Sequence, residues 1–249
     1  MSKYWDEMEK FRQPKISKLK TNVSNSKDKA SKKGKELHPI VVSSKTIAKS
    51  WWGKAWCENL ERYADYENRI DRGKRYVKAG TVIDLQIERE RIFAKVQGSR
   101  KTPYKVEIHI RSLSEKKCRS IMERYGKKLE TIESLLFGDF PDDMQELFKE
   151  RGGLFPEPKE IDFDCSCPDW ALMCKHVAAA LYGVAVRLDE DPMLFFTLRG
   201  IDMEQFIDST LGDRVEKMLA NSEKVLKSSS RILDKKLQKK LFGDLNSNE

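Results

Sequence analysis

Four residues between positions 165 and 176 constrain this chain more than any other part of its sequence. Cys165 and Cys167 form a C-x-C pair, and Cys174 and His176 follow, after a spacer of six residues, as a C-x-H pair. Three thiolates and one imidazole are a ligand set that Zn²⁺ takes in closed tetrahedral sites. The sequence therefore predicts one metal site, and the softness of the ligands favours zinc.

The residues on either side indicate how the chain brings these ligands together. Residues 161–164 read as a strand, Pro168 turns the chain, and a helix is expected from about His176 onward. That helix is apolar on almost every side as far as Val186, which is typical of a buried helix. We therefore expect the metal to join a central helix to the strand before it, so that metal binding and folding are linked.

Other uses of the cysteines fit the sequence less well. Two cysteines one residue apart on a strand point to opposite faces, which suits a hydrophobic core poorly. Cytosolic thiols stay reduced, which disfavours a disulfide, and redox chemistry favours C-x-x-C over C-x-C. Four protein ligands also fill a tetrahedral shell, so the pattern favours a structural zinc over a catalytic one. Asp164 and Asp169, the carboxylates beside the cluster, would then have no metal-bound water to activate.

The pattern resembles that of the SWIM zinc finger family, in which C-x-C is followed by a variable spacer and C-x-H. Three further segments are similar to those of bacterial SWIM zinc finger proteins, so the resemblance covers residues 40–200. They are residues 50–56, 59–66 and 97–106. The resemblance implies binding to DNA or to proteins. It also implies a SWI2/SNF2-type helicase as partner, because such helicases are often encoded beside the bacterial members.

The net charge of +8 is concentrated in three basic blocks. Residues 1–40 contain eleven Lys and Arg against five Asp and Glu, residues 69–111 twelve against five, and residues 224–240 seven against one. The rest of the chain is therefore acidic. Basic blocks on an acidic frame favour an anionic polymer as partner. No apolar run approaches the ~20 residues of a membrane span, so no membrane partner is expected.

Two predicted loops concentrate cations beside a predicted sheet. One lies just before the first strand, and the other, residues 98–105, joins the second strand to the third. Arg, Lys, Ser, Thr and backbone N–H groups are the usual phosphate contacts. We therefore predict a nucleic-acid face at these loops, with DNA favoured over RNA, and a solvated charged rim as the alternative. The residues expected there are Arg69, Arg72, Lys74, Arg75, Lys78, Arg100, Lys101 and Lys105.

Hydrophobic periodicity predicts an α+β fold, with an N-terminal helix and a small antiparallel sheet followed by a helical half that contains the zinc site. Trp52, Trp56, Leu60 and Tyr63 fall on one face of the N-terminal helix, and such a stripe is more often core than a binding platform. Alternating segments within residues 81–111 predict three antiparallel strands. Ser114 is a good cap for the first helix of the second half.

Composition divides the chain into five segments. Residues 1–38 are expected to be a basic disordered arm, because they have too few large apolar residues to offset ordering entropy. Contact with nucleic acid and simple solvation fit this arm equally. A helix-plus-sheet region (39–111), a helical connector (112–160), the zinc finger (161–200) and a C-terminal helical region with a basic stretch (201–249) follow. Its leucine stripe beside lysines fits a partner-binding helix or a phosphate-facing one.

Three functions from different classes fit the sequence. The one we favour is a nonenzymatic, cytoplasmic protein that binds nucleic acid and is accessory to a SWI2/SNF2-type ATPase. The second is a protein-interaction adaptor with a purely structural zinc and no nucleic-acid contact. The third is a zinc hydrolase or nuclease, which needs an open coordination position and a nearby base. No P-loop, triad signature or paired-carboxylate motif is present elsewhere. Oligomeric state and sequence preference are left open.

Overall fold

The structure is a computed structural model that describes residues 14–61, 67–125, 144–150, 152–169, 171, 173–202 and 219. Met1–Met203 group into one compact unit and Glu204–Glu249 into a second, so all of these residues except Leu219 belong to the first unit. Among them, no helix is both long and apolar enough to cross a membrane. The predicted C-terminal helices and their leucine stripe lie outside the described residues.

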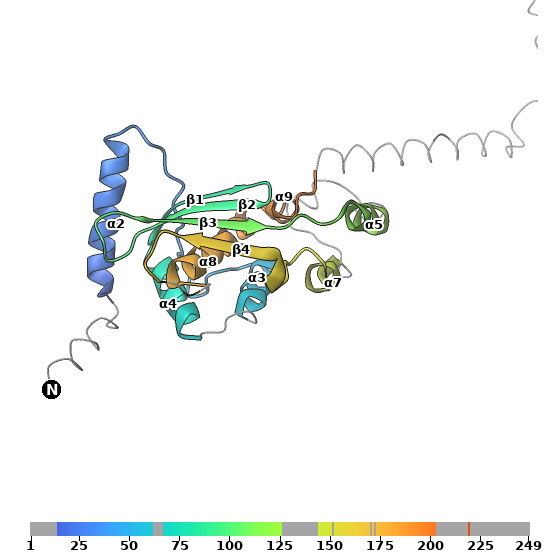
Figure 1. Cartoon of the computed structure of the whole chain (residues 1–249), viewed down its shortest axis with the longest axis horizontal. Coiled ribbons are helices and arrows are strands. Elements are labelled where there is room, and N and C mark those ends of the chain that lie inside the picture. Colours follow the sequence, from blue (N-terminus) through green and yellow to red (C-terminus); the bar gives the residue numbers. More distant parts are fainter. Residues whose placement is uncertain are drawn as a thin grey trace, which may run out of the picture. The chain divides into compact units, whose positions relative to one another are not determined.

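A four-stranded antiparallel sheet, in the order β1-β2-β3-β4, forms the middle of the first unit (Figure 1). The strands are β1 (Val82–Glu88), β2 (Arg91–Val96), β3 (Tyr104–Ile110) and β4 (Ile161–Cys165). The first three are the strands that alternation predicts, and Glu90, with φ 63°, lies in the tight turn between β1 and β2. β4 is the strand expected before the zinc ligands. Its pairing with β3 makes it the fourth strand of the sheet, and local pattern does not predict this pairing.

One face of this sheet is buried. Leu85, Ala94 and Val106 lie opposite one another on β1, β2 and β3 and are at most 5% exposed. Cys165 lies opposite Val106, so strand alternation directs its side chain to the same buried face. Asp164, one residue earlier, is exposed and therefore lies on the other face. The fold thus separates the first zinc ligand from the carboxylate next to it.

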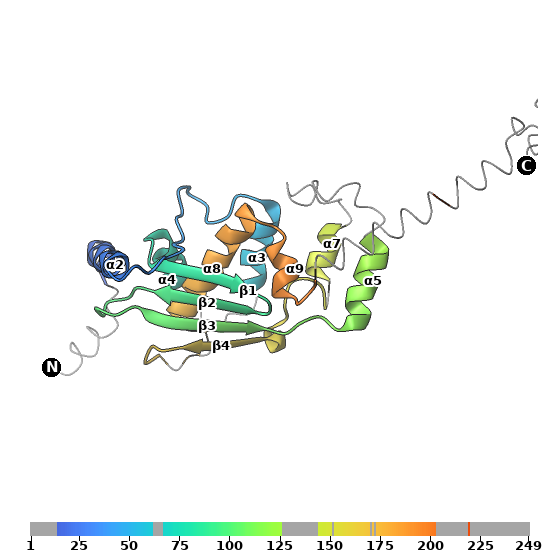
Figure 2. The ribbon, with the colours of Figure 1, turned by 90° about the horizontal axis from the view of Figure 1, so that it is seen from above.

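Helix α8 (Lys175–Glu190) covers the buried face of the sheet (Figure 2). It contacts all four strands as well as α3 (Trp51–Glu61) and α4 (Glu67–Lys78), and its residues from His176 to Val186 are all buried. This confirms the central helix that the all-round apolar pattern predicts. Elements from two of the predicted segments, 39–111 and 161–200, therefore share one core, while the predicted boundaries at 39, 112 and 161 stay a prediction.

Two glycines let backbones approach α8 closely. A Cβ atom on Gly73 of α4 would lie 2.5 Å from the Cβ of Ala178, and one on Gly183 would lie 2.9 Å from Cδ1 of Leu85. Both distances are too short for real carbon atoms. A side chain at either position would therefore push α4 or β1 away from α8.

The stripe of α3 is core at Trp56 and Leu60, as predicted, while Trp52 is half-buried. Trp56 and Leu60 are each 1% exposed, and the indole N–H of Trp56 donates a hydrogen bond to the carbonyl oxygen of Leu181 at 3.0 Å. Tyr63, the last member of the stripe, lies outside the described residues. The helix begins where the hydroxyl of Ser50 accepts a hydrogen bond from the N–H of Gly53 at 3.0 Å, which is the geometry of an N-terminal cap.

The connector contributes short helices at one end of the sheet. They are α5 (Glu115–Tyr125), α7 (Met144–Lys149) and the single turn η1 (Pro158–Glu160), and α9 (Leu194–Leu198) follows α8. α5 begins after Ser114, as predicted. Residues 126–143 of the connector lie outside the described residues. Arg199, only 1% exposed, joins α9 to the start of β4 through Glu160 at 3.1 Å.

The N-terminal arm corrects the prediction of disorder for part of its length. Ile16–Ser31 form helix α2, in which Leu19 is fully buried and Ser26 is 8% exposed. The amide of Asn22 donates to the carbonyl oxygens of Gly98 at 3.1 Å and Ser99 at 3.3 Å. The prediction is wrong here because it considered apolar burial alone, whereas polar side chains make many of the contacts of this helix. Residues 1–13 are outside the described part.

Candidate metal centre and basic groove

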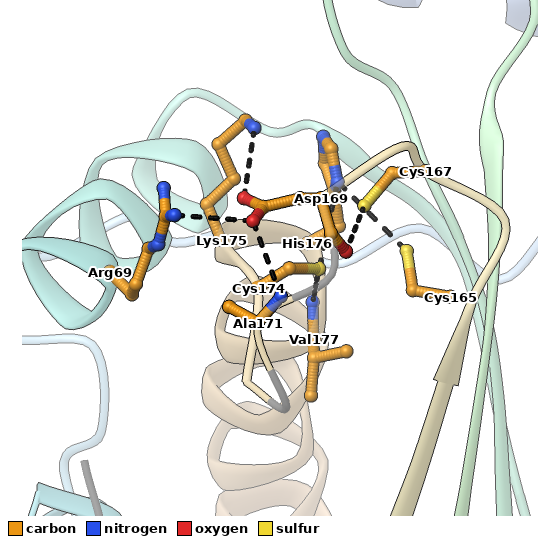
Figure 3. Close-up of polar contacts among 9 residues, drawn as sticks. All are labelled: Arg69, Cys165, Cys167, Asp169, Ala171, Cys174, Lys175, His176 and Val177. Carbon is orange, nitrogen blue, oxygen red and sulfur yellow. Dashed lines mark hydrogen bonds and ion pairs between the residues drawn. The ribbon is translucent and has the colours of Figure 1, made fainter. Parts of the chain in front are cut away.

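The four predicted zinc ligands converge at the N-terminal end of α8 (Figure 3). Cys165 ends β4, Cys167 lies in the turn that follows, Cys174 is the N-cap of α8, and His176 is in its first turn. One potential ligand atom from each residue lies within 4.8 Å of the other three. The strand-turn-helix arrangement therefore brings together residues that the sequence separates by up to eleven positions.

The spacing of these atoms fits a tetrahedral zinc ion. Nδ1 of His176 lies 3.8 Å from Sγ of Cys174 and 4.0 Å from Sγ of Cys165. Zinc bonds of about 2.3 Å to sulfur and 2.0–2.1 Å to nitrogen place neighbouring ligand atoms roughly 3.5–3.8 Å apart. Shifts of a few tenths of an ångström at these atoms are therefore enough for one ion to bind both sulfurs and the ring nitrogen.

The ionisation of the three thiols also favours a cation at their centre. A hydrogen bond from Cys165, opposed by burial and reinforced by His176 and by the N–H of Val177, lowers the pKa of Cys174 to about 3. The pKa of Cys165 is raised because its thiol bonds to Cys174 and because it is buried, and burial raises the pKa of Cys167. Burial and the closeness of the thiols thus oppose the ionisation of all three together, and a divalent cation at their centre would offset this.

The surroundings orient the ligands. The N–H of Val177 donates to Sγ of Cys174 at 3.5 Å, so the thiolate caps the helix whose N-terminal dipole stabilises it. Nε2 of His176 is buried and has no hydrogen-bond partner among the described residues, which leaves Nδ1 as the nitrogen that faces the sulfurs. The donor set and the geometry together fit one structural zinc ion.

The carboxylates beside the cluster do not face it as a catalytic base would. Asp169 forms an ion pair with Arg69 at 3.1 Å and a longer one with Lys175 at 3.9 Å. Lys175 follows the cluster ligand Cys174 in the chain, and its ion pair is with Asp169. Asp164 is exposed on the opposite face of the sheet.

The five predicted contacts before the first strand lie on a helix, which corrects their assignment to a loop. They belong to α4. Ile70, Tyr76 and Val77, all at most 6% exposed, give this helix an apolar face that packs against the core, with the cations between them in sequence. Three of the five cations are engaged within the fold. Arg69 pairs with Asp169, Lys74 pairs with Glu61 at 2.8 Å, and Arg75 donates to the carbonyl oxygen of Pro14 at 3.0 Å.

Of the other predicted contacts, Lys78 and the three cations of the loop are more open to solvent, whereas Arg72 is not. Arg72 is half-buried, and its Nε has no partner within the described part of the chain. Lys78, Lys101 and Lys105 are exposed. Arg100 is also exposed, and its guanidinium lies 5.7 Å from the centre of the Tyr104 ring. The predicted contacts therefore do not lie on two similar loops. Those of residues 69–78 lie on a helix, and those of residues 100–105 are exposed at or near a loop.

Sequence reasoning missed the surface where cations from distant segments meet. Two adjoining hollows between α2, α4 and residues 40–42 form what we term the basic groove. Its polar and charged lining residues are Lys20, Ser24, Lys27, Lys74, Arg75 and Lys78, and no carboxylate from the described residues lines it. The available signal was the spacing of Leu19, Val23 and Ser26, which places a half-apolar stripe along a lysine-rich helix.

A strand, a turn and a helix that offer three thiolates and one imidazole define a zinc finger. Residues 159–182 match the model of the SWIM zinc finger. The chain therefore contains a SWIM zinc finger, as the spacing of its four ligands predicts. This module is a small part of the first unit, and its helix is the centre of that unit.

A relative extends the similarity well beyond this module. The chain is 34% identical over 172 residues to the uncharacterized protein Rv2102 of Mycobacterium tuberculosis. The matched region covers 68% of this chain and 62% of that protein, so it spans less than two thirds of the relative's length. No solved structure matches the chain.

Proposed function

We propose that this protein binds nucleic acid, with DNA favoured over RNA, through the basic groove, and that its zinc has a structural role. The observation that supports this best is the groove itself. Lys20 and Lys27 of α2 and Lys78 of α4 line it, and none of the three forms an ion pair with any described residue. Three lysines that form no ion pair suit a ligand that presents repeated negative charges.

The groove also joins two of the three basic blocks of the sequence. Lys20 and Lys27, seven residues apart, lie on one face of α2, and Lys78 ends the facing helix. The rest of the lining is largely aliphatic, including Ile40 and Val41. Lysine contacts to phosphate position a nucleic acid without reading its bases. We therefore expect binding that depends on charge and little on sequence.

A nonenzymatic role is part of the proposal. Three sulfurs and one ring nitrogen fill a tetrahedral zinc shell, which leaves no position for a reacting water. The ion pairs of Asp169 with Arg69 and Lys175 occupy the carboxylate beside the site. The metal would then stabilise the junction of β4 and α8, and the groove would supply the binding surface.

The cellular setting that we propose rests on the sequence. A cytoplasmic location suits a zinc site whose thiols must stay reduced. An accessory role beside a SWI2/SNF2-type ATPase is supported by the resemblance to bacterial SWIM proteins. Stimulation by this protein of the DNA-dependent ATPase activity of such an enzyme would test that role, and ATPase rates that stay constant over a titration would count against it.

The binding proposal is tested by titrating the full chain against labelled duplex DNA, duplex RNA and single strands between about 50 and 200 mM salt. Each neutralised phosphate of B-DNA contributes about −0.9 to the slope of log K against log salt. Three lysines alone therefore predict a slope of about −2.7. The variant with Lys20→Ala, Lys27→Ala and Lys78→Ala should bind more weakly and lose most of that slope.

A matched control removes the same charge elsewhere. Lys54, Lys116 and Lys149 are exposed and lie outside the groove. Their replacement by alanine should leave most of the affinity and slope intact. Equal losses in the two triple variants would show that net charge, not the groove, determines binding. No binding to any nucleic acid at low salt would refute the proposal and favour the adaptor function.

A further inference from the structure

The His176 imidazole contacts two parts of the fold besides the sulfurs. The residue is 1% exposed, and its ring centre lies 4.2 Å from that of Tyr104, at the start of β3, with 32° between the planes. Tyr76 of α4 approaches it edge-on at 5.6 Å. A change in the position of this ring must therefore displace both tyrosines, because the surrounding core is closely packed.

The loop after β2 lies directly on this pair of rings. A Cβ atom on Gly98 would lie 2.6 Å from Cε2 of Tyr104 and 3.2 Å from Nε2 of His176. The backbone of Gly98 thus rests against both the zinc-binding imidazole and its stacking partner. Since a side chain would not fit there, the position of the loop depends directly on the position of the ring.

The same loop is where α2 is attached. Asn22 donates to the carbonyl oxygens of Gly98 and Ser99, and the hydroxyl of Ser26 donates to Oε1 of Gln97 at 2.6 Å. Gln97 is fully buried, and its Nε2 donates in turn to the carbonyl oxygens of Gly98 at 3.1 Å and Arg100 at 2.6 Å. One buried amide therefore contributes both to the shape of the loop and to the position of α2. Figure 1 shows α2 beside the end of the sheet where this loop joins β2 to β3.

These contacts form a continuous path from the metal site to the basic groove. It runs from His176 to Gly98, from Gly98 and Gln97 to Asn22 and Ser26, and along α2 to Lys20 and Lys27. The α2 wall of the groove is attached largely by polar groups and by Leu19. A helix with so little buried apolar surface depends on its attachment site for its order.

We infer that zinc binding and occupancy of the basic groove are thermodynamically coupled through His176 and the residue 97–100 loop. Zinc fixes the imidazole, the imidazole supports the loop, and the loop positions the lysines of α2. Linkage is reciprocal, so a polyanion in the groove must raise the affinity for zinc by the factor by which zinc raises affinity for the polyanion. The inference rests on the proposed function and adds to it a metal-dependent control of binding.

The test measures zinc affinity of the full chain by equilibrium competition with a colorimetric chelator, with and without a saturating DNA duplex of about 20 base pairs at low salt. Coupling of the usual size would raise zinc affinity about 5-fold or more when duplex is bound. Equal zinc affinities with and without bound duplex would overturn the inference while leaving the proposed function intact. Failure of the duplex to bind would instead refute the proposed function.

Hydrogen exchange tests the zinc-to-α2 part without nucleic acid. Removal of zinc should speed the exchange of amides in α2 more than that of amides in β2, which serves as the internal reference. Equal protection of α2 with and without zinc would overturn the inference. If zinc removal unfolds the whole unit, two variants that keep zinc bound test the coupling instead.

Two variants interrupt the contacts between the metal site and α2 while zinc stays bound. His176→Cys replaces the ring by a fourth thiolate, a ligand set that also binds structural zinc, so zinc should stay bound while duplex affinity falls several-fold and α2 loses protection. The double variant Asn22→Ala, Ser26→Ala should retain wild-type zinc affinity without duplex and show little change when duplex is added. Wild-type coupling in either zinc-bound variant would overturn the inference.

Discussion

Replacement of Cys174 by serine separates its two structural roles. Cys174 is the N-cap of α8, with φ −76° and ψ 167°, and its sulfur accepts a hydrogen bond from the N–H of Val177. Serine is among the preferred N-cap residues, so Cys174→Ser should preserve the start of the helix. What the variant loses is the most readily ionised of the three thiols. The expected loss of stability is therefore due to the metal.

The size of the effect follows from binding linkage. Zinc at about 1,000 times its dissociation constant stabilises the folded state by about 4 kcal/mol. For a chain of this size each kcal/mol corresponds to about 2–4 °C in Tm. If the variant binds no zinc, its Tm should fall by roughly 8–16 °C at that zinc concentration. A larger fall is consistent with the central position of α8, which contacts every strand of the sheet.

The assay combines thermal unfolding by circular dichroism with metal content by atomic absorption. Wild-type protein should contain one zinc per chain, and a chelator should lower its Tm to about that of Cys174→Ser, on which the chelator should have no effect. Cys118→Ser is the matched control, because Cys118 is a half-buried thiol on α5 outside the cluster. A Cys174→Ser protein that contains one zinc and unfolds with the control would refute the reasoning.

Three further predictions concern the packing and charges around α8. Gly73→Ala should lower the denaturant midpoint. Overpacking against Ala178 costs about 1–3 kcal/mol, which outweighs the ~1 kcal/mol that alanine gains over glycine in a helix. A raised midpoint would show that α4 moves away from α8 freely. Arg199→Met should lower the free energy of unfolding in urea by about 3 kcal/mol, because it leaves the Glu160 carboxylate without its buried partner. Adding Glu160→Gln should recover part of this loss. No recovery would mean that the ion pair is not the cause. Burial alone raises the pKa of Glu61, but hydrogen bonds from Lys74 and Tyr182 outweigh it and lower the pKa, so its contribution to stability is present above its ordinary pKa and is lost as pH falls through the lowered value. Glu61→Gln should therefore be less stable than wild type near neutral pH and lose less stability on acidification, and parallel pH profiles of the free energy of unfolding would contradict this.

The zinc ligands, the α+β class and the buried central helix are all predictable from the sequence. Each depends on a short-range pattern. Cys165, Cys167, Cys174 and His176 lie within one strand, turn and helix, so their spacing predicts the ligand cluster that the structure has. The apolar run from Val177 to Val186 has no polar face to expose, and α8 is buried accordingly.

The places where charged side chains from distant segments meet depend on tertiary packing. Asn22, Ser26 and Gln97 order α2 through polar contacts between segments about 70 residues apart, and no local pattern predicts such partners. Long-range ion pairs likewise engage Arg69 and Lys74, while Lys78 faces Lys20 and Lys27 across the groove. Periodicity records which face of an element is buried, but the identity of the facing element depends on how the whole chain packs.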